Sequence, residues 1–260
     1  MSSDMFLLDM PNFIPKYKEH ENYGYKGKGG ENLKNILIKA SKGYCMYCYA
    51  KILIDRKNFG QLEHSIEKFN CNKLVNCPAN ISITCSKCNG SFKKKSEKIR
   101  TLTRVEIDNF EAFSECNITC IDACNGYSDL RNIYTKKKEG EIILQPFGIK
   151  NNDTQNVYLI QYDILNQKFV PSNTYNYQDK EKEFIIKHIN RFNLNDPKYR
   201  TKEFLYFIED AIEYNAIPKK NRYCNLVVDL FIERMQTLPK EKAIKICNLI
   251  YTQLTVKDKN

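Results

Sequence analysis

Two Cys-x-x-Cys pairs constrain this sequence more than any other feature. The pairs are Cys45 with Cys48 and Cys85 with Cys88. Each pair spaces two thiolates so that both can reach one tetrahedral ion, and four sulfurs complete its coordination shell without leaving an open position for a substrate. Zinc is the usual ion for four thiolates, although iron is chemically possible. The sequence therefore predicts a structural zinc site.

The interval between the two pairs is longer than the roughly 15 to 20 residues of a simple four-cysteine ribbon, so it must hold folded structure of its own. Residues 61–64 and 80–84 are predicted to be short strands, and the second runs directly into Cys85. The tract 89–98 can form a helix with a strongly basic face. The expected order is strand, loop, strand, helix.

The character of the sequence changes twice along the chain, which predicts three regions. Residues 1–42 form a loop-rich lead that ends in a short amphipathic helix, and residues 43–105 contain the cysteine pairs. Residues 106–260 contain a β-hairpin signal between 157 and 170. Four segments of helical apolar periodicity follow it, separated by prolines. The predicted fold class is α+β and mainly helical.

The composition narrows the class of partner. Lys and Arg number 41 against 31 Asp and Glu, which gives a net charge of +10. This excess favours an acidic partner such as nucleic acid, an anionic membrane surface or a phosphorylated substrate.

The sequence also indicates a location. No apolar run approaches the roughly 18 residues of a membrane helix, and eleven cysteines without a secretory signal suit a reducing compartment. We therefore expect a cytoplasmic protein that does not bind membranes.

The motifs in and around the cysteine pairs form a pattern of ten residues. These are Cys45, Cys48, Glu63, His64, Asn80, Ile81, Cys85, Cys88, Asn89 and Lys93. Over about residues 32 to 98, this pattern resembles the HNH endonucleases with zinc-knuckle cysteines and a ββα-metal fold. It looks most like the HNH subunit of Septu-type anti-phage systems, which some retrons also use. The sequence differs from that subgroup at Glu67, where proline is usual.

The resemblance implies roles for four residues in phosphodiester hydrolysis. His64 would be the general base, because an imidazole that is neutral near physiological pH can take a proton from the attacking water. Glu63 and Asn89 would hold a catalytic Mg²⁺ or Mn²⁺ through oxygen atoms, which hard cations prefer. Asn80 would hold the loop that orients His64.

Four lysines are candidates for contacts with nucleic-acid phosphates: Lys68, Lys93, Lys94 and Lys95. Such contacts would be sensitive to salt and independent of sequence. Because phosphates are common to DNA and RNA, the lysines do not distinguish the two polymers. We favour DNA as the substrate, and RNA stays possible. A lysine run is equally often a solvated helix face. The resemblance also implies an ATPase partner, with the region 106–260 as its docking surface, in antiviral defence.

Two alternatives stay open. The chain could be a noncatalytic zinc-ribbon module that binds nucleic acid or protein. Cys116, Cys120 and Cys124, spaced by four, could line one helix face as a second metal site, or they could be small apolar core residues. His188 lies on a predicted helix and is expected to be solvated.

Overall fold

The computed structural model describes residues 3–113, 123–196, 203–219 and 223–257. It has the α+β fold that the sequence predicts. The described residues form three small antiparallel sheets, of which the two-stranded one at residues 53–58 was not predicted. The helices are α1 (Gly27–Ala40), α2 (Arg104–Phe113), α3 (Asn125–Thr135), α4 (Asp179–Arg191), α5 (Glu203–Glu213), α6 (Leu226–Gln236) and α7 (Lys240–Lys257). The strands are β1 (Leu7–Asp9), β2 (Leu53–Ile54), β3 (Lys57–Asn58), β4 (Gln61–His64), β5 (Ile81–Thr84), β6 (Ile160–Asp163) and β7 (Lys168–Pro171).

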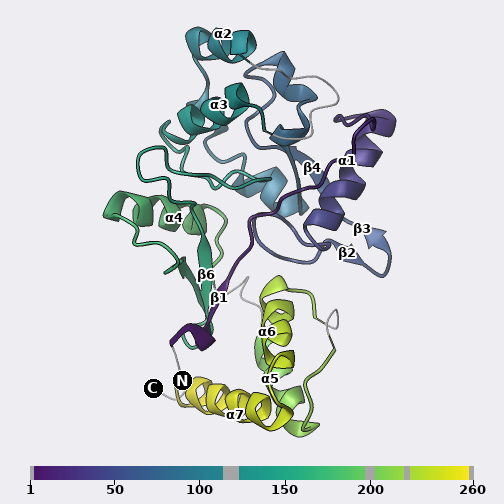
Figure 1. Cartoon of the computed structure of the whole chain (residues 1–260), viewed down its shortest axis with the longest axis vertical. Coiled ribbons are helices and arrows are strands. Elements are labelled where there is room, and N and C mark those ends of the chain that lie inside the picture. Colours follow the sequence, from purple (N-terminus) through teal and green to yellow (C-terminus); the bar gives the residue numbers. More distant parts are fainter. Residues whose placement is uncertain (1–2, 114–122, 197–202, 220–222, 258–260) are drawn as a thin grey trace.

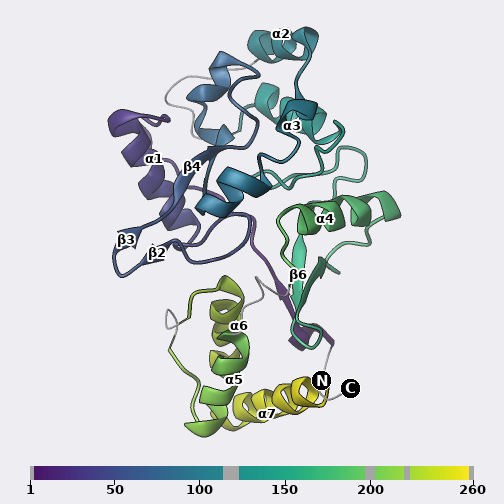
Figure 2. The ribbon, with the colours of Figure 1, turned by 180° about the vertical axis from the view of Figure 1, so that it is seen from behind.

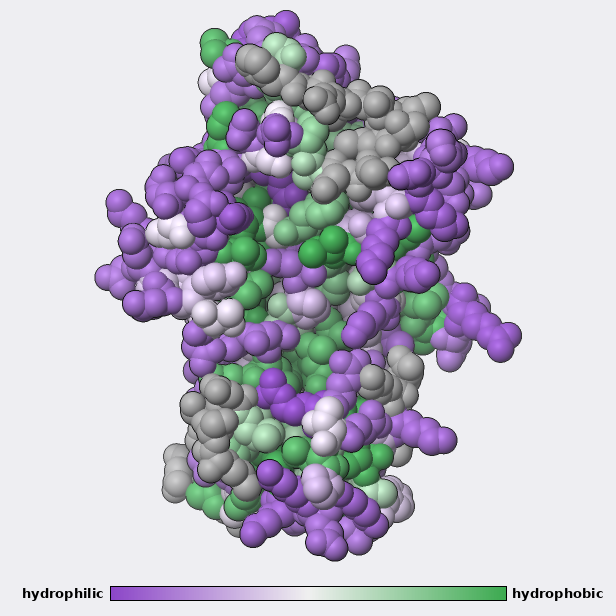
Figure 3. All heavy atoms as spheres, viewed as in Figure 1, coloured by the Kyte–Doolittle hydropathy of each residue, from purple (hydrophilic) through white to green (hydrophobic). Residues whose placement is uncertain are grey.

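The molecule is elongated, and its two ends have different contents. Helices α1 to α3 and strands β2 to β5 lie at one end, whereas α5, α6 and α7 lie at the other (Figures 1 and 2). Strands β1 and β6 run between the two ends, with α4 beside them (Figure 1). Hydrophilic side chains cover most of the face seen in Figure 3, and hydrophobic ones are gathered in patches along its middle.

The part that contains the cysteine pairs is built on the two-stranded sheet of β4 and β5. These strands are antiparallel, with Glu63 opposite Ser82 and His64 opposite Ile81. Helical backbone then covers residues 86–92. The predicted order of strand, loop, strand and helix is confirmed, but the helix expected over 89–98 is wrong in its bounds: residues 93–96 form a turn, and a short 3-10 helix follows at Glu97–Arg100. Helix α1 packs against β5, and its apolar face is buried through Leu33 and Leu37.

The second sheet joins segments that lie far apart in the sequence. Strands β6 and β7 form the predicted hairpin, and β1 pairs with β6. The sequence analysis missed β1, because three residues are too few to show alternation. Arg234 in α6 donates to the carbonyl oxygens of Met5 and Leu7 at 3.0 and 2.7 Å. Residues 1–42 are therefore divided: β1 belongs with the carboxy-terminal part and α1 with the cysteine part.

The four helices predicted in the carboxy-terminal region are confirmed as α4 to α7. Helices α2 and α3 were not predicted. Cys116 and Cys120 lie outside the described residues, and Cys124 directly precedes α3. None of the helices within the described ranges is long and apolar enough to cross a membrane.

Candidate functional site

The two cysteine pairs converge as their spacing predicts. The sulfur atoms of Cys45, Cys48, Cys85 and Cys88 all lie within 4.8 Å of one another. The first pair is tied to the β4–β5 sheet, because the backbone N–H of Met46 donates to the carbonyl oxygen of Ile83 in β5 at 3.1 Å. Four sulfurs at these distances could hold a structural metal such as zinc.

A hollow of about 350 Å³ lies next to the end of β4, and none of the four cysteines lines it. Glu63, His64 and Asn89 all line it, although they come from the end of β4 and from the turn after β5. Lys68 and Lys94 also line it, whereas Lys95 does not. The three residues to which the resemblance assigns chemistry thus line one hollow, with no hydrogen bond or ion pair joining their side chains.

His64 ends β4 with its ring buried. Its Nε2 lies 3.0 Å from the carbonyl oxygen of Val75, and since a carbonyl oxygen can only accept, Nε2 carries the proton. Nδ1 then holds the free lone pair, and it has no hydrogen-bond partner among the described residues. The ring of Tyr25 contacts the imidazole with 4.4 Å between centroids. Burial lowers the pKa of His64, with smaller contributions from Lys68 and Lys93, which favours the neutral form.

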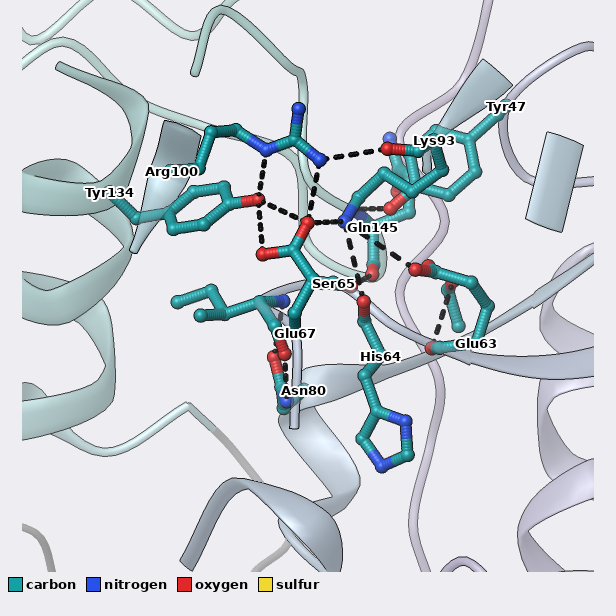
Figure 4. Close-up of polar contacts among 12 residues, drawn as sticks. Tyr47, Glu63, His64, Ser65, Glu67, Asn80, Lys93, Arg100, Tyr134 and Gln145 are labelled. Atoms are coloured by element: carbon teal, nitrogen blue, oxygen red, sulfur yellow. Dashed lines mark hydrogen bonds and ion pairs between the residues drawn. The ribbon is translucent and has the colours of Figure 1, made fainter. Parts of the chain in front are cut away.

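Glu63 is buried between a hydroxyl and an ammonium group. Its Oε2 accepts a hydrogen bond from Ser82 Oγ at 3.1 Å, and its Oε1 lies 3.5 Å from Lys93 Nζ. Burial raises the pKa of Glu63 to about 6, although Lys93 opposes this rise. Figure 4 shows the carboxylate of Glu63 facing Lys93, and the imidazole of His64 pointing away from that contact.

Lys93 does not lie on the exposed basic face that the sequence analysis predicts. Its side chain is 2 % exposed, and its Nζ lies 3.1 Å from Glu67 Oε1. The residues Cys88–Phe92 form a π-helical turn, in which the N–H of Lys93 donates to the carbonyl of Cys88. A π-turn holds an extra residue, which rotates the following side chain relative to an α-helix and here directs it inward. Lys94 and Lys95 are exposed, as expected.

Glu67, the position at which the chain departs from the Septu-type pattern, is the centre of a buried ionic cluster (Figure 4). Its Oε1 lies 2.6 Å from Arg100 Nη2, and Tyr134 in α3 donates its hydroxyl to Oε2 at 2.7 Å. Burial alone would raise the pKa of Glu67, but Lys93 and Arg100 outweigh it and hold this pKa below its usual range. The sequence gives no signal for this cluster, because its members are far apart in the chain.

Asn80 is fully buried and ties the loop between β4 and β5 together. Its Oδ1 accepts from the N–H of Ile66 at 2.8 Å and from the hydroxyl of Tyr127 at 2.8 Å. Its Nδ2 donates to the carbonyl oxygens of Ile66 and Leu74 at 3.0 and 3.1 Å. Leu74 precedes Val75, which fixes the imidazole, so Asn80 holds the loop segment that orients His64.

Asn89 is half-buried, and a hydrogen bond to Gln61 in β4 fixes the orientation of its side chain. Its Nδ2 donates to Gln61 Oε1 at 2.9 Å, which leaves the amide oxygen available. This oxygen and the carboxylate of Glu63 are the donor types that Mg²⁺ and Mn²⁺ prefer. Apart from the four cysteines, no group of three or more His, Cys, Asp and Glu side chains within the described ranges is close enough to hold an ion. A cation here would need water or phosphate oxygens as its other ligands.

Comparison of the chain with protein-family models, with curated proteins and with solved structures finds no match.

Proposed function

We propose that this chain is a metal-dependent endonuclease of the HNH type, which hydrolyses phosphodiester bonds in nucleic acid. The single observation that carries the proposal is that Glu63, His64 and Asn89 line one hollow. These are the residues to which the resemblance assigns the chemistry. Asn89 directly follows Cys88 of the four-cysteine cluster. The four cysteines would hold structural zinc and so keep β5 and the turn after it in place.

In this proposal, His64 is the general base. Its Nε2–H is held by Val75, so Nδ1 is the atom that accepts a proton from the attacking water. Asn80 acts as a positioning residue, because it holds the loop that contains Val75. Glu63 and Asn89 would hold Mg²⁺ or Mn²⁺, which when bound neutralises charge on the phosphate and on the departing oxygen.

Lys68 and Lys94 line the same hollow and would attract the phosphates that flank the cleaved bond. We favour DNA as the substrate, with RNA as the second possibility. By the same resemblance, the protein would be the effector subunit of a cytoplasmic antiviral complex, and residues 106–260 would bind its ATPase partner.

The test is a cleavage assay on supercoiled plasmid and on RNA, with Mg²⁺ or Mn²⁺. We expect His64→Ala to reduce the cleavage rate by about 10²-fold or more, the usual contribution of a general base. His20→Ala is the matched control, since His20 is exposed and does not line the hollow. Equal cleavage by wild type and His64→Ala, or no cleavage by either protein even with the ATPase partner present, would favour a noncatalytic zinc-ribbon module instead.

A further inference from the structure

A row of exposed lysines leads away from the hollow that contains His64. Lys94 lines that hollow, and Lys95 lines a second hollow of about 430 Å³ together with Lys138. Lys138 and Lys136 line a third hollow of about 470 Å³. The three hollows are therefore linked through shared or adjacent lysines. We call Lys94, Lys95, Lys138 and Lys136 the basic track.

Two arginines hold the backbone beneath the basic track. The carbonyl oxygen of Lys95 accepts from Arg100 Nη1 at 2.8 Å and from Arg191 Nη1 at 2.7 Å. The same two guanidinium groups donate to the carbonyl oxygen of Glu139, at 3.4 and 3.1 Å. Because Glu139 follows Lys138, these bonds place the backbone of Lys95 and of Lys138 side by side. The track is thus built on a fixed backbone, although its two halves lie far apart in the sequence.

In the second and third hollows, the charge of the basic track is not neutralised by carboxylates, whereas in the first hollow Glu97 lines the wall together with Lys94. Three acidic residues line the second and third hollows, and each has a basic partner of its own: Glu139 with Arg191, Glu141 with Lys187, and Glu106 with Lys137. By contrast, no ion pair between described residues involves a lysine of the track. Four positive charges therefore face solvent next to the candidate catalytic hollow.

We propose that the basic track binds the sugar-phosphate backbone of the nucleic acid on one side of the bond that is cut. This inference rests on the proposed function and adds the surface over which the substrate lies. Lysine ammonium groups recognise phosphates as point charges and carry no base-reading pattern, so binding along the track is independent of sequence and weakens as salt is raised.

The test is the salt dependence of binding, measured by fluorescence anisotropy without added divalent ions, so that no cleavage is scored. The probes are a labelled single-stranded DNA of about 20 nucleotides, the matching RNA and the DNA duplex. The variant is Lys95→Gln/Lys138→Gln. The control is Lys242→Gln/Lys245→Gln, two exposed lysines on α7 at the opposite end of the molecule (Figure 1).

Each phosphate contact contributes about 0.9 to the slope of log K against log salt for duplex DNA, and about 0.7 for single strands. The track variant removes two lysines, so we expect its slope to be smaller by about 1.8 on the duplex and by about 1.4 on the single strands. The control should keep the wild-type slope. Equal slopes for the track variant and wild type, or no binding by wild type, would refute the proposal that the basic track binds nucleic acid. Binding through the track without any cleavage would refute the proposed function alone.

Discussion

Replacing Lys93 by methionine tests whether its ammonium group is a buried counter-ion. The substitution keeps a long flexible side chain but leaves two buried carboxylates without a shared cation. Glu67 retains Arg100 at 2.6 Å, whereas Glu63 retains only the Ser82 hydroxyl at 3.1 Å. Removing one partner of a buried ion pair costs about 3–5 kcal/mol. We expect about 3 kcal/mol, the lower end, because Glu67 keeps a cation and Glu63 can take up a proton.

The measurement is urea unfolding followed by far-UV circular dichroism at neutral pH. Lys95→Met is the matched control, since Lys95 is exposed, and its effect should stay within about 0.5 kcal/mol. Adding Glu63→Gln to Lys93→Met removes the orphaned carboxylate and should recover more than half of the loss. If Lys93→Met and Lys95→Met had equal effects, Lys93 would be a solvated lysine and the buried cluster would be refuted.

Three further predictions concern the metal site, the loop and pH. Purified protein should carry about one zinc ion per chain, and Cys85→Ser should lose it; full zinc content in that variant by mass spectrometry would contradict the site. Asn80→Ala should lower the free energy of unfolding in urea by about 3 kcal/mol, because several buried groups lose their hydrogen-bond partners. A loss under about 1 kcal/mol would argue that Asn80 does not hold the loop between β4 and β5. Burial lowers the pKa of His188 from 6.5 to about 3, so the unfolded chain binds the extra proton first and stability falls below pH 6.5. We expect a loss of about 2 kcal/mol between pH 7 and pH 5, which His188→Gln should remove; an unchanged pH dependence in that variant would refute it.

The sequence predicts those parts of the fold that follow from short-range patterns. The spacing of the cysteines indicates the cluster, and alternation or helical periodicity indicates the hairpin and helices α4 to α7. The order of β4, β5 and the helical turn also follows from local signals. Glu63, His64 and Asn89 line one hollow. That they form an active site stays a prediction from the resemblance.

Long-range contacts explain what the sequence does not predict. β1 is a strand only because β6, more than 150 positions later, offers it hydrogen bonds. The environment of Lys93 depends on Glu67 and on a π-turn, neither of which has a periodic signature. The expectation that His188 is solvated is wrong: it is 2 % exposed, and its Nδ1 accepts from the N–H of Ile143 at 2.9 Å. Its helix carries polar residues, but His188 faces inward, where its ring lies near Tyr47 and accepts from the backbone of Ile143.

The most direct test of the proposed active site is anomalous diffraction at the manganese edge from crystals soaked in Mn²⁺. The account predicts a peak in the hollow within about 2.5 Å of oxygen atoms of Glu63 and Asn89, and its loss in Glu63→Gln. A wild-type map with no peak in that hollow, or a peak that persists unchanged in Glu63→Gln, would contradict the account.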